Sequence, residues 1–205
     1  MQETSIGRDQ VVGEVHYLES IGRDFVKSAS VLLENENEQD GPSAHWNSIN
    51  LLASQALELL PKSLIAYKIC LDKNNSSLEE IHRAINKKLG CLGHELDDIF
   101  GEVSELKTAL SVIKIERINS KTNKGVFIDE FRFIIKDNSG NEKIIRIKNL
   151  EAARYGLFAK NPDAGVNLVG DMKNIVDFLK KLSEETNKFR ASMITEFDKN
   201  MKKII

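Results

Sequence analysis

The spacing of hydrophobic residues along the chain predicts long helices at its beginning. In two segments, apolar or small residues recur at alternating steps of about three and four, which places them on one face of a helix. The first stripe comprises Val11, Val15, Leu18, Gly22, Phe25, Ala29 and Leu32. The second stripe comprises Trp46, Ile49, Ala53, Ala56, Leu60, Leu64, Tyr67 and Leu71. Pro61 interrupts the second stripe and is expected to kink that helix, because proline has no backbone N–H.

Two further segments with helical spacing follow. The third begins with Ser77 and Glu80, which are placed as a capping box, and its regular stripe predicts one helix that continues to Leu110. This stripe comprises Leu78, Ile81, Ile85, Leu89, Leu92, Leu96, Ile99, Val103, Leu106 and Leu110. The fourth comprises Leu168, Met172, Ile175, Leu179, Leu182, Phe189, Met193 and Met201.

Between the third and fourth helices the period of the pattern changes to two, which is typical of strands. Phe131, Phe133 and Ile135 alternate with other residues, Ser139-Gly140 marks a turn, and the apolar pattern resumes after it. Residues 125–129 are expected to add a third strand. Since an isolated hairpin is marginal in water, this sheet must pack on the helices or on another chain. The pattern predicts a mainly α fold, a four-helix-type bundle with a small antiparallel β insertion at about 112–150.

Composition and charge narrow the class of protein. The 205 residues, of which 41% are hydrophobic, suit a single domain over 1–205, because no internal repeat or long low-complexity linker divides the chain. The net charge of −2 argues against a general nucleic-acid-binding surface. Residues 112–149 nevertheless hold nine Lys/Arg against five Asp/Glu, which leaves the rest of the chain at −6.

The cysteines and the N-terminal segment indicate a cytoplasmic protein. Cys70 and Cys91 have neither metal-ligand spacing nor the pattern of a disulfide framework. The segment "MQETSIGRDQ" lacks the features of a signal peptide, and no apolar run reaches the roughly 18 residues that cross a bilayer. We expect no membrane partner and no cofactor.

The stretch "NKKLGCLGHELDDIF", residues 86–100, departs from the helical pattern around it. Each glycine in a helix interior costs about 1 kcal/mol relative to alanine. If the helix were continuous, His94 would lie opposite the buried stripe, on a face with Arg83, Lys87, Gly90, Cys91, Asp97, Asp98, Gly101 and Glu105. This face is interpreted as a place where another helix or a ligand comes close. We therefore expect a homodimer whose interface includes the third helix near residues 90–101.

Other chemistry at these residues is less favoured. His94 with Asp97 or Asp98 has the spacing of helical metal ligands, but no second histidine is near in the sequence, so no metal is predicted. Cys91 and His94 have the composition of a thiolate–imidazole pair without a third, orienting group. Arg154 and Tyr155 are candidates for binding an anion, although an ordinary stacked or salt-bridged pair is the favoured interpretation.

Two helical segments resemble those of a known superfamily. "LLASQALELLPKSLIAY" (51–67), a polar loop and then "GHELDDIF" (93–100) look like the HEPN superfamily, and "ARYG" (153–156) is similar to a segment that follows in several HEPN-like families. The resemblance covers roughly residues 10–110 and the last helix. It implies a helical bundle that tends to dimerise and belongs to prokaryotic defence or toxin–antitoxin systems. The β insertion is not part of the minimal family fold.

Active HEPN proteins are metal-independent ribonucleases that use an arginine, a following polar residue and a histidine after a short gap. No arginine fits here, because Arg8 and His16 have seven residues between them. Lys88 and His94 come nearest, with Leu89 in place of the polar residue, and lysine cannot form the bidentate fork of arginine.

The sequence therefore favours a non-catalytic HEPN-like interaction or binding module, with a possible partner protein besides its own second copy. The first alternative is a HEPN ribonuclease that uses Lys88 and His94 and binds RNA. The second alternative is a helical ligand- or partner-binding protein that is unrelated to the superfamily.

Overall fold

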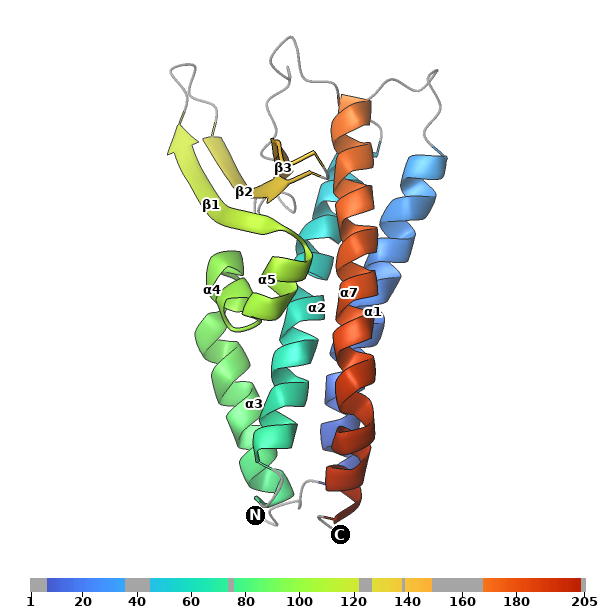
Figure 1. Cartoon of the computed structure of the whole chain (residues 1–205), viewed down its shortest axis with the longest axis vertical. Coiled ribbons are helices and arrows are strands. Elements are labelled where there is room, and N and C mark those ends of the chain that lie inside the picture. Colours follow the sequence, from blue (N-terminus) through green and yellow to red (C-terminus); the bar gives the residue numbers. More distant parts are fainter. Residues whose placement is uncertain are drawn as a thin grey trace.

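Six helices and a three-stranded antiparallel sheet make up the described part of the chain, which confirms the predicted mainly α class (Figure 1). The computed structural model describes residues 7–35, 45–73, 76–121, 127–137, 139–148 and 168–203. The elements are α1 (Arg8–Glu34), α2 (Trp46–Asp72), α3 (Leu78–Leu92), α4 (Leu96–Gly101), α5 (Ser104–Ala109), β1 (Val112–Lys121), β2 (Phe127–Lys136), β3 (Glu142–Lys148) and α7 (Leu168–Lys203).

Helix α2 lies at the centre of the molecule. The helices α1 and α7 run along it, α3 packs against its C-terminal half, and β3 contacts its other half (Figure 1). Because neighbours surround it, α2 is buried on most of its circumference rather than on one stripe. The helix runs through Pro61, which is itself buried.

Two apolar clusters form the core. The larger one lies between α1, α2, α7 and the sheet, and its largest fully buried side chains include Phe100 and Phe133, whose rings meet edge to face. The smaller cluster joins the beginning of α1, the end of α2, α3 and the end of α7. It comprises Val11, Val15, Ala66, Tyr67, Cys70, Ile81, Ile85 and Phe197.

The prediction of one helix from Leu78 to Leu110 is wrong. The capping box of Ser77 and Glu80 is present, but α3 ends at Leu92 and is followed by the short helices α4 and α5. Gly93 has φ 54° and ψ −128°, a conformation that other residues rarely adopt. The apolar stripe continued past this break because α4 and α5 also bury one side each.

The sheet differs from the prediction in the identity of its third strand. This strand is β1, whereas residues 127–129 belong to β2 and residues 125 and 126 lie outside the described residues. The strand order is β1-β2-β3. The turn at Gly140, with φ 81°, is as predicted. The face toward the helices carries the buried residues Ile115, Phe131, Phe133, Ile145 and Ile147.

Gly22 allows α1 to approach α2 closely, and its replacement by valine should destabilise the protein. A Cβ at Gly22 would lie 2.8 Å from Cγ of Leu60, so Gly22→Val should lower the free energy of unfolding by about 2 kcal/mol. The matched control is Gly13→Ala on the same helix, where a Cβ would meet nothing within 4 Å. That change should raise stability by up to about 1 kcal/mol. Urea unfolding measures both, and equal effects of the two changes would contradict the close contact.

Candidate functional site

Four polar residues of α2 recur at every fourth position and are buried. They are Asn50, Ser54, Glu58 and Lys62, with exposed fractions of 0%, 5%, 8% and 7%. Residues four apart lie one above another on a helix, so they form one line, here called the polar row. Buried polar groups are costly unless they have partners, so the contacts of the polar row indicate what it does.

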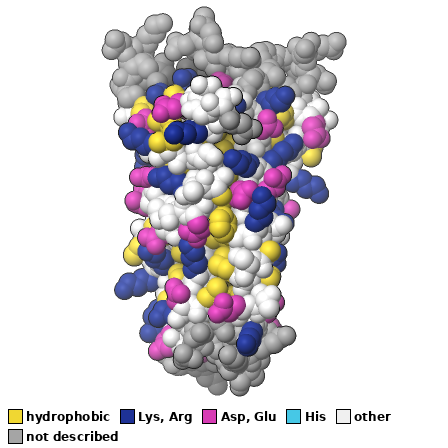
Figure 2. All heavy atoms as spheres, viewed as in Figure 1, with side chains coloured by type: hydrophobic (Ala, Val, Ile, Leu, Met, Phe, Trp, Pro, Cys, Tyr) yellow, Lys and Arg dark blue, Asp and Glu magenta, His cyan; other side chains and the backbone are white. Residues whose placement is uncertain are grey.

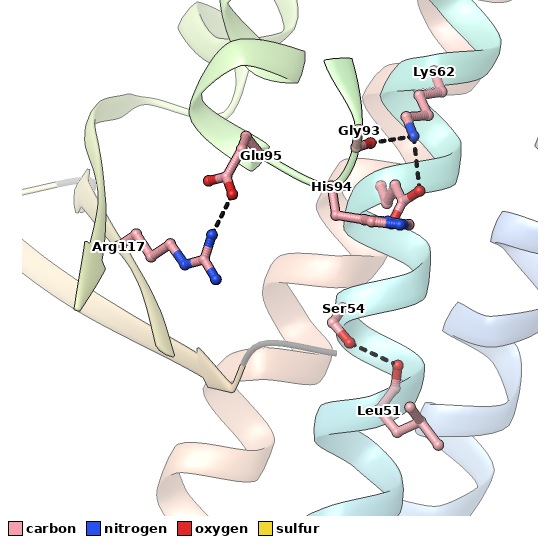
Figure 3. Close-up of polar contacts among 8 residues, drawn as sticks. Leu51, Ser54, Lys62, Gly93, His94, Glu95 and Arg117 are labelled. Atoms are coloured by element: carbon pink, nitrogen blue, oxygen red, sulfur yellow. Dashed lines mark hydrogen bonds and ion pairs between the residues drawn. The ribbon is translucent and has the colours of Figure 1, made fainter. Parts of the chain in front are cut away.

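The C-terminal half of the polar row holds the break after α3 in place. Lys62 Nζ lies 2.8 Å from Glu58 Oε1 and donates a second hydrogen bond of 2.5 Å to the carbonyl oxygen of Gly93 (Figure 3). That carbonyl belongs to the end of α3, where the partial negative charge of the helix favours a cation. The ammonium group of Lys62 therefore joins α2 to the turn that separates α3 from α4.

His94 is held by the same carboxylate. Its Nδ1 lies 2.7 Å from Glu58 Oε2, and its side chain is 69% exposed while that of Glu58 is 11% exposed. Nε2 of His94 has no hydrogen bond to the described residues. A carboxylate at one ring nitrogen fixes the orientation of an imidazole and leaves the other nitrogen available to a ligand or a proton.

The carboxylate next to His94 in the sequence, that of Glu95, is also paired. Glu95, which precedes α4, forms an ion pair with Arg117 of β1, and this pair ties the sheet to α4 (Figure 3). The Arg117 guanidinium also lies 5.7 Å from the centre of the Phe131 ring. At the other end of the polar row, Asn50 accepts a 3.0 Å hydrogen bond from the backbone N–H of Lys148 in β3.

The structure does not bring Lys88 and His94 to a common site. Lys88 forms a 2.9 Å ion pair with Glu102, whereas His94 binds Glu58. Lys88 lines an open hollow of about 340 Å³ between α2, α3 and the segment after α4. Its other lining residues are Ile65, Lys68, Ile69, Asp72, Lys73, Ala84 and Glu102.

The other residues selected from the sequence are dispersed. Arg83, Lys87 and Asp98 are exposed and form no ion pair with the described residues, and Asp97 lies 3.5 Å from Lys107. Cys91 is exposed and makes no hydrogen bond to His94 within the part of the chain that the structure describes. Arg154 and Tyr155 lie outside the described residues. Within the described ranges, no group of three or more His, Cys, Asp or Glu is placed to hold a metal ion.

The glycines near His94 do not mark a close contact within the chain. A Cβ added at Gly90, Gly93 or Gly101 would meet nothing within 4 Å. At Gly93 the positive φ explains the glycine by itself. Gly90 and Gly101 are exposed and lie close to the ends of α3 and α4, where glycine is tolerated more easily. The interpretation of a continuous glycine-bearing face is therefore wrong.

A second polar network, which the sequence patterns did not reveal, crosses the bundle near the C-terminal end of α2. Tyr67 of α2 lies 2.8 Å from Nδ1 of His16 and donates a 3.2 Å hydrogen bond to Glu19. Glu19 is 4% exposed and forms a 2.7 Å ion pair with Arg190 of α7. The network joins α1, α2 and α7. Its signal in the sequence is weak, because a lone tyrosine or glutamate in a helical stripe is usual.

The buried groups of this network are poor nucleophiles or bases. Burial is the main cause that raises the pKa of the Tyr67 phenol to about 12. Burial also raises the pKa of the neighbouring Cys70 thiol to about 12. At neutral pH both groups keep their protons, so the network acts as a tie between helices.

Comparisons with protein-family models, with curated proteins and with solved structures gave no match for this chain. Among the described residues, no helix combines the length and the apolar character that crossing a membrane requires.

Removing Lys62 should destabilise the protein strongly. Lys62→Met would leave the Glu58 carboxylate and the Gly93 carbonyl without their buried donor, so we expect a loss of about 3 kcal/mol in the free energy of unfolding. Adding Glu58→Gln should recover part of the loss. The control is Lys107→Met, because Lys107 meets the exposed Asp97 at 3.5 Å and its loss should cost less than about 0.5 kcal/mol. Similar losses for the two lysines in urea unfolding would contradict a buried tie.

Tyr67 should make the protein unstable at high pH. In the unfolded chain the phenol ionises near pH 10, and in the folded chain near pH 12, so stability is fully present below pH 10 and falls as the pH rises to 12. Tyrosinate absorbance should show a late ionisation that Tyr67→Phe removes and that Tyr17→Phe, at a 63% exposed position, does not. A late step that persists in Tyr67→Phe would contradict the assignment.

Proposed function

We propose that this chain is a non-catalytic, HEPN-like binding module of a prokaryotic defence or toxin–antitoxin system that acts through a partner protein and through its own dimer. The family assignment rests on the sequence segments 51–67 and 93–100. The observation that supports a non-catalytic role is the separate engagement of Lys88 by Glu102 and of His94 by Glu58.

The electrostatic surroundings of His94 disfavour phosphodiester cleavage. Metal-independent cleavage of RNA needs an acid, a base and positive charge on the reacting phosphate. His94 contacts the carboxylate of Glu58, and Glu95 follows His94 in the sequence. The nearby cations are not available to a phosphate, because Lys62 is buried and Arg117 is paired with Glu95. On the face in Figure 2, basic and acidic side chains are interspersed among the described residues instead of forming a broad basic surface. A polyanion would therefore be held poorly.

One observation favours the ribonuclease alternative. The 2.7 Å contact between Glu58 and Nδ1 of His94 is the arrangement that orients a histidine for proton transfer at Nε2. In that alternative His94 is the acid or base, Glu58 is its positioning residue, and Lys88 must leave Glu102 to reach the phosphate. A helical ligand- or partner-binding protein outside the superfamily is the third candidate, and the hollow beside Lys88 is its most direct support.

Incubation of the purified protein with structured and with single-stranded RNA tests the proposal. We expect no cleavage above background, and the same result for His94→Ala, Glu58→Gln and Lys88→Met. His94 and Lys88 are surface residues whose loss should leave the fold intact, whereas Glu58 is buried, so circular dichroism must show that Glu58→Gln folds.

Cleavage by the natural protein that His94→Ala abolishes would overturn the proposal in favour of the ribonuclease. A parallel loss in Lys88→Met would identify the lysine as the phosphate-binding group, and a changed pH profile in Glu58→Gln would identify the positioning carboxylate. Cleavage that persists in all three variants would indicate a contaminating nuclease and leave the binding module as the proposal.

A further inference from the structure

The two edges of the sheet differ in how they are covered. At the β3 edge, the backbone N–H of Lys148 bonds to Asn50 of α2 at 3.0 Å, and Lys143 bonds to Asn174 of α7 at 2.6 Å. At the other edge, β1 pairs with β2 and with no further strand among the described residues (Figure 1). An edge strand exposes unpaired N–H and C=O groups that can pair with another strand. Among the described residues, the outer edge of β1 (Val112–Lys121) therefore has no strand beside it.

The side chains of β1 alternate in a way that suits pairing with itself. Ile115 points to the helices and is 5% exposed, while Lys114 and Glu116 lie on the opposite face of the sheet. Their side chains form a 2.6 Å ion pair along the strand, and that of Lys114 is 63% exposed. Ile113, at the irregularity near the start of β1, is 45% exposed.

We propose that β1 pairs antiparallel with β1 of a second copy of this chain, about a two-fold axis at Ile115. Lys114 then faces Glu116 of the partner subunit, and the same contact occurs again on the other side of the axis. This inference rests on the proposed function as an interaction module and names one of its partners, a second copy bound by strand addition.

The charges of β1 favour this register over its neighbours. An antiparallel pair about a two-fold axis places the central residue opposite itself. An axis at Lys114, Glu116 or Arg117 would therefore place like charges opposite each other, which is destabilising. An axis at Ile118 brings no two charged residues opposite each other and gains no ion pair. The axis at Ile115 gains two Lys–Glu contacts.

This location replaces the dimer contact expected near residues 90–101. The glycines there no longer require a close neighbour, because α3 ends at Gly93 and the conformation of Gly93 accounts for its identity. A contact along one strand is small compared with stable interfaces, so we expect a dissociation constant of about 10 to 100 µM.

Exchange of the charges at positions 114 and 116 provides the test. The mass of the protein in solution is measured by sedimentation or light scattering from about 10 to 500 µM, a range that brackets the expected dissociation constant. The natural protein should dimerise with rising concentration. Lys114→Glu and Glu116→Lys should each stay monomeric, because each places like charges opposite each other. An equimolar mixture of these two variants should form a heterodimer, and the double variant K114E/E116K should dimerise again. The side chain of Lys114 is 63% exposed and that of Glu116 is 31% exposed, so the variants should fold, which circular dichroism checks.

The control is Arg146→Glu, which changes a charge on the same sheet but on β3, and which should dimerise like the natural protein. A natural protein that stays monomeric over the whole range would overturn the inference, as would single variants that dimerise normally or a mixture that stays monomeric. Loss of the dimer in Gly90→Leu but not in the charge variants would assign the contact to α3 instead. None of these outcomes bears on RNA cleavage, so a monomer without ribonuclease activity would overturn this inference and the dimer of the proposed function, and would leave a non-catalytic module that acts through a partner protein.

Discussion

The buried ammonium group of Lys62 is the constraint on which the arrangement of this protein depends. It binds Glu58 on its own helix and the carbonyl oxygen of Gly93 at the end of α3. Without a positive φ at Gly93, α3 would continue straight on, and α4 and α5 would not turn toward the sheet. The position of α4 in turn sets the Glu95–Arg117 ion pair that ties β1 to the helices. One buried charge thereby links the bundle to the sheet.

The central helix shows why buried polar groups are retained in a bundle. Apolar residues in place of Glu58 and Lys62 would often be neutral or stabilising, because removing charges from water is costly. In this chain Lys62 donates a hydrogen bond to the carbonyl oxygen of Gly93, and Glu58 contacts the imidazole of His94. The pair therefore selects one position of the turn between α3 and α4. Tyr67 and Glu19 select the relative positions of α1, α2 and α7 in the same way. The apolar core drives association of the helices, and these networks fix their alignment.

The sequence predicted the features that depend on local periodicity and missed those that depend on partners far along the chain. The stripes of α1, α2 and α7, the Ser77–Glu80 capping box and the turn at Gly140 follow from spacing and turn chemistry. The helix break at Gly93 was missed, because the apolar stripe continues through it and the presence of a glycine does not by itself indicate a positive φ angle. His94 was selected from the sequence, but its partner Glu58 lies 36 residues away on another helix. No local pattern shows such a pairing, whereas Lys88 was paired with His94 because their spacing comes nearest to the HEPN motif.

Among the described residues, the buried charged groups have partners within the chain, whereas the edge of the sheet at β1 is the proposed site of contact with another chain. On α2 the buried charges of Glu58 and Lys62 find partners within the chain, and the outer edge of β3 is bonded to α2 and α7. At β1 the side chains of Lys114 and Glu116 satisfy each other, whereas the backbone of the outer edge has no strand beside it among the described residues. Side-chain pairs can exchange partners with little loss, and backbone groups at a sheet edge can exchange their bonds to water for bonds to another strand. An association of this chain is therefore expected to begin at the sheet, with the bundle as its rigid support.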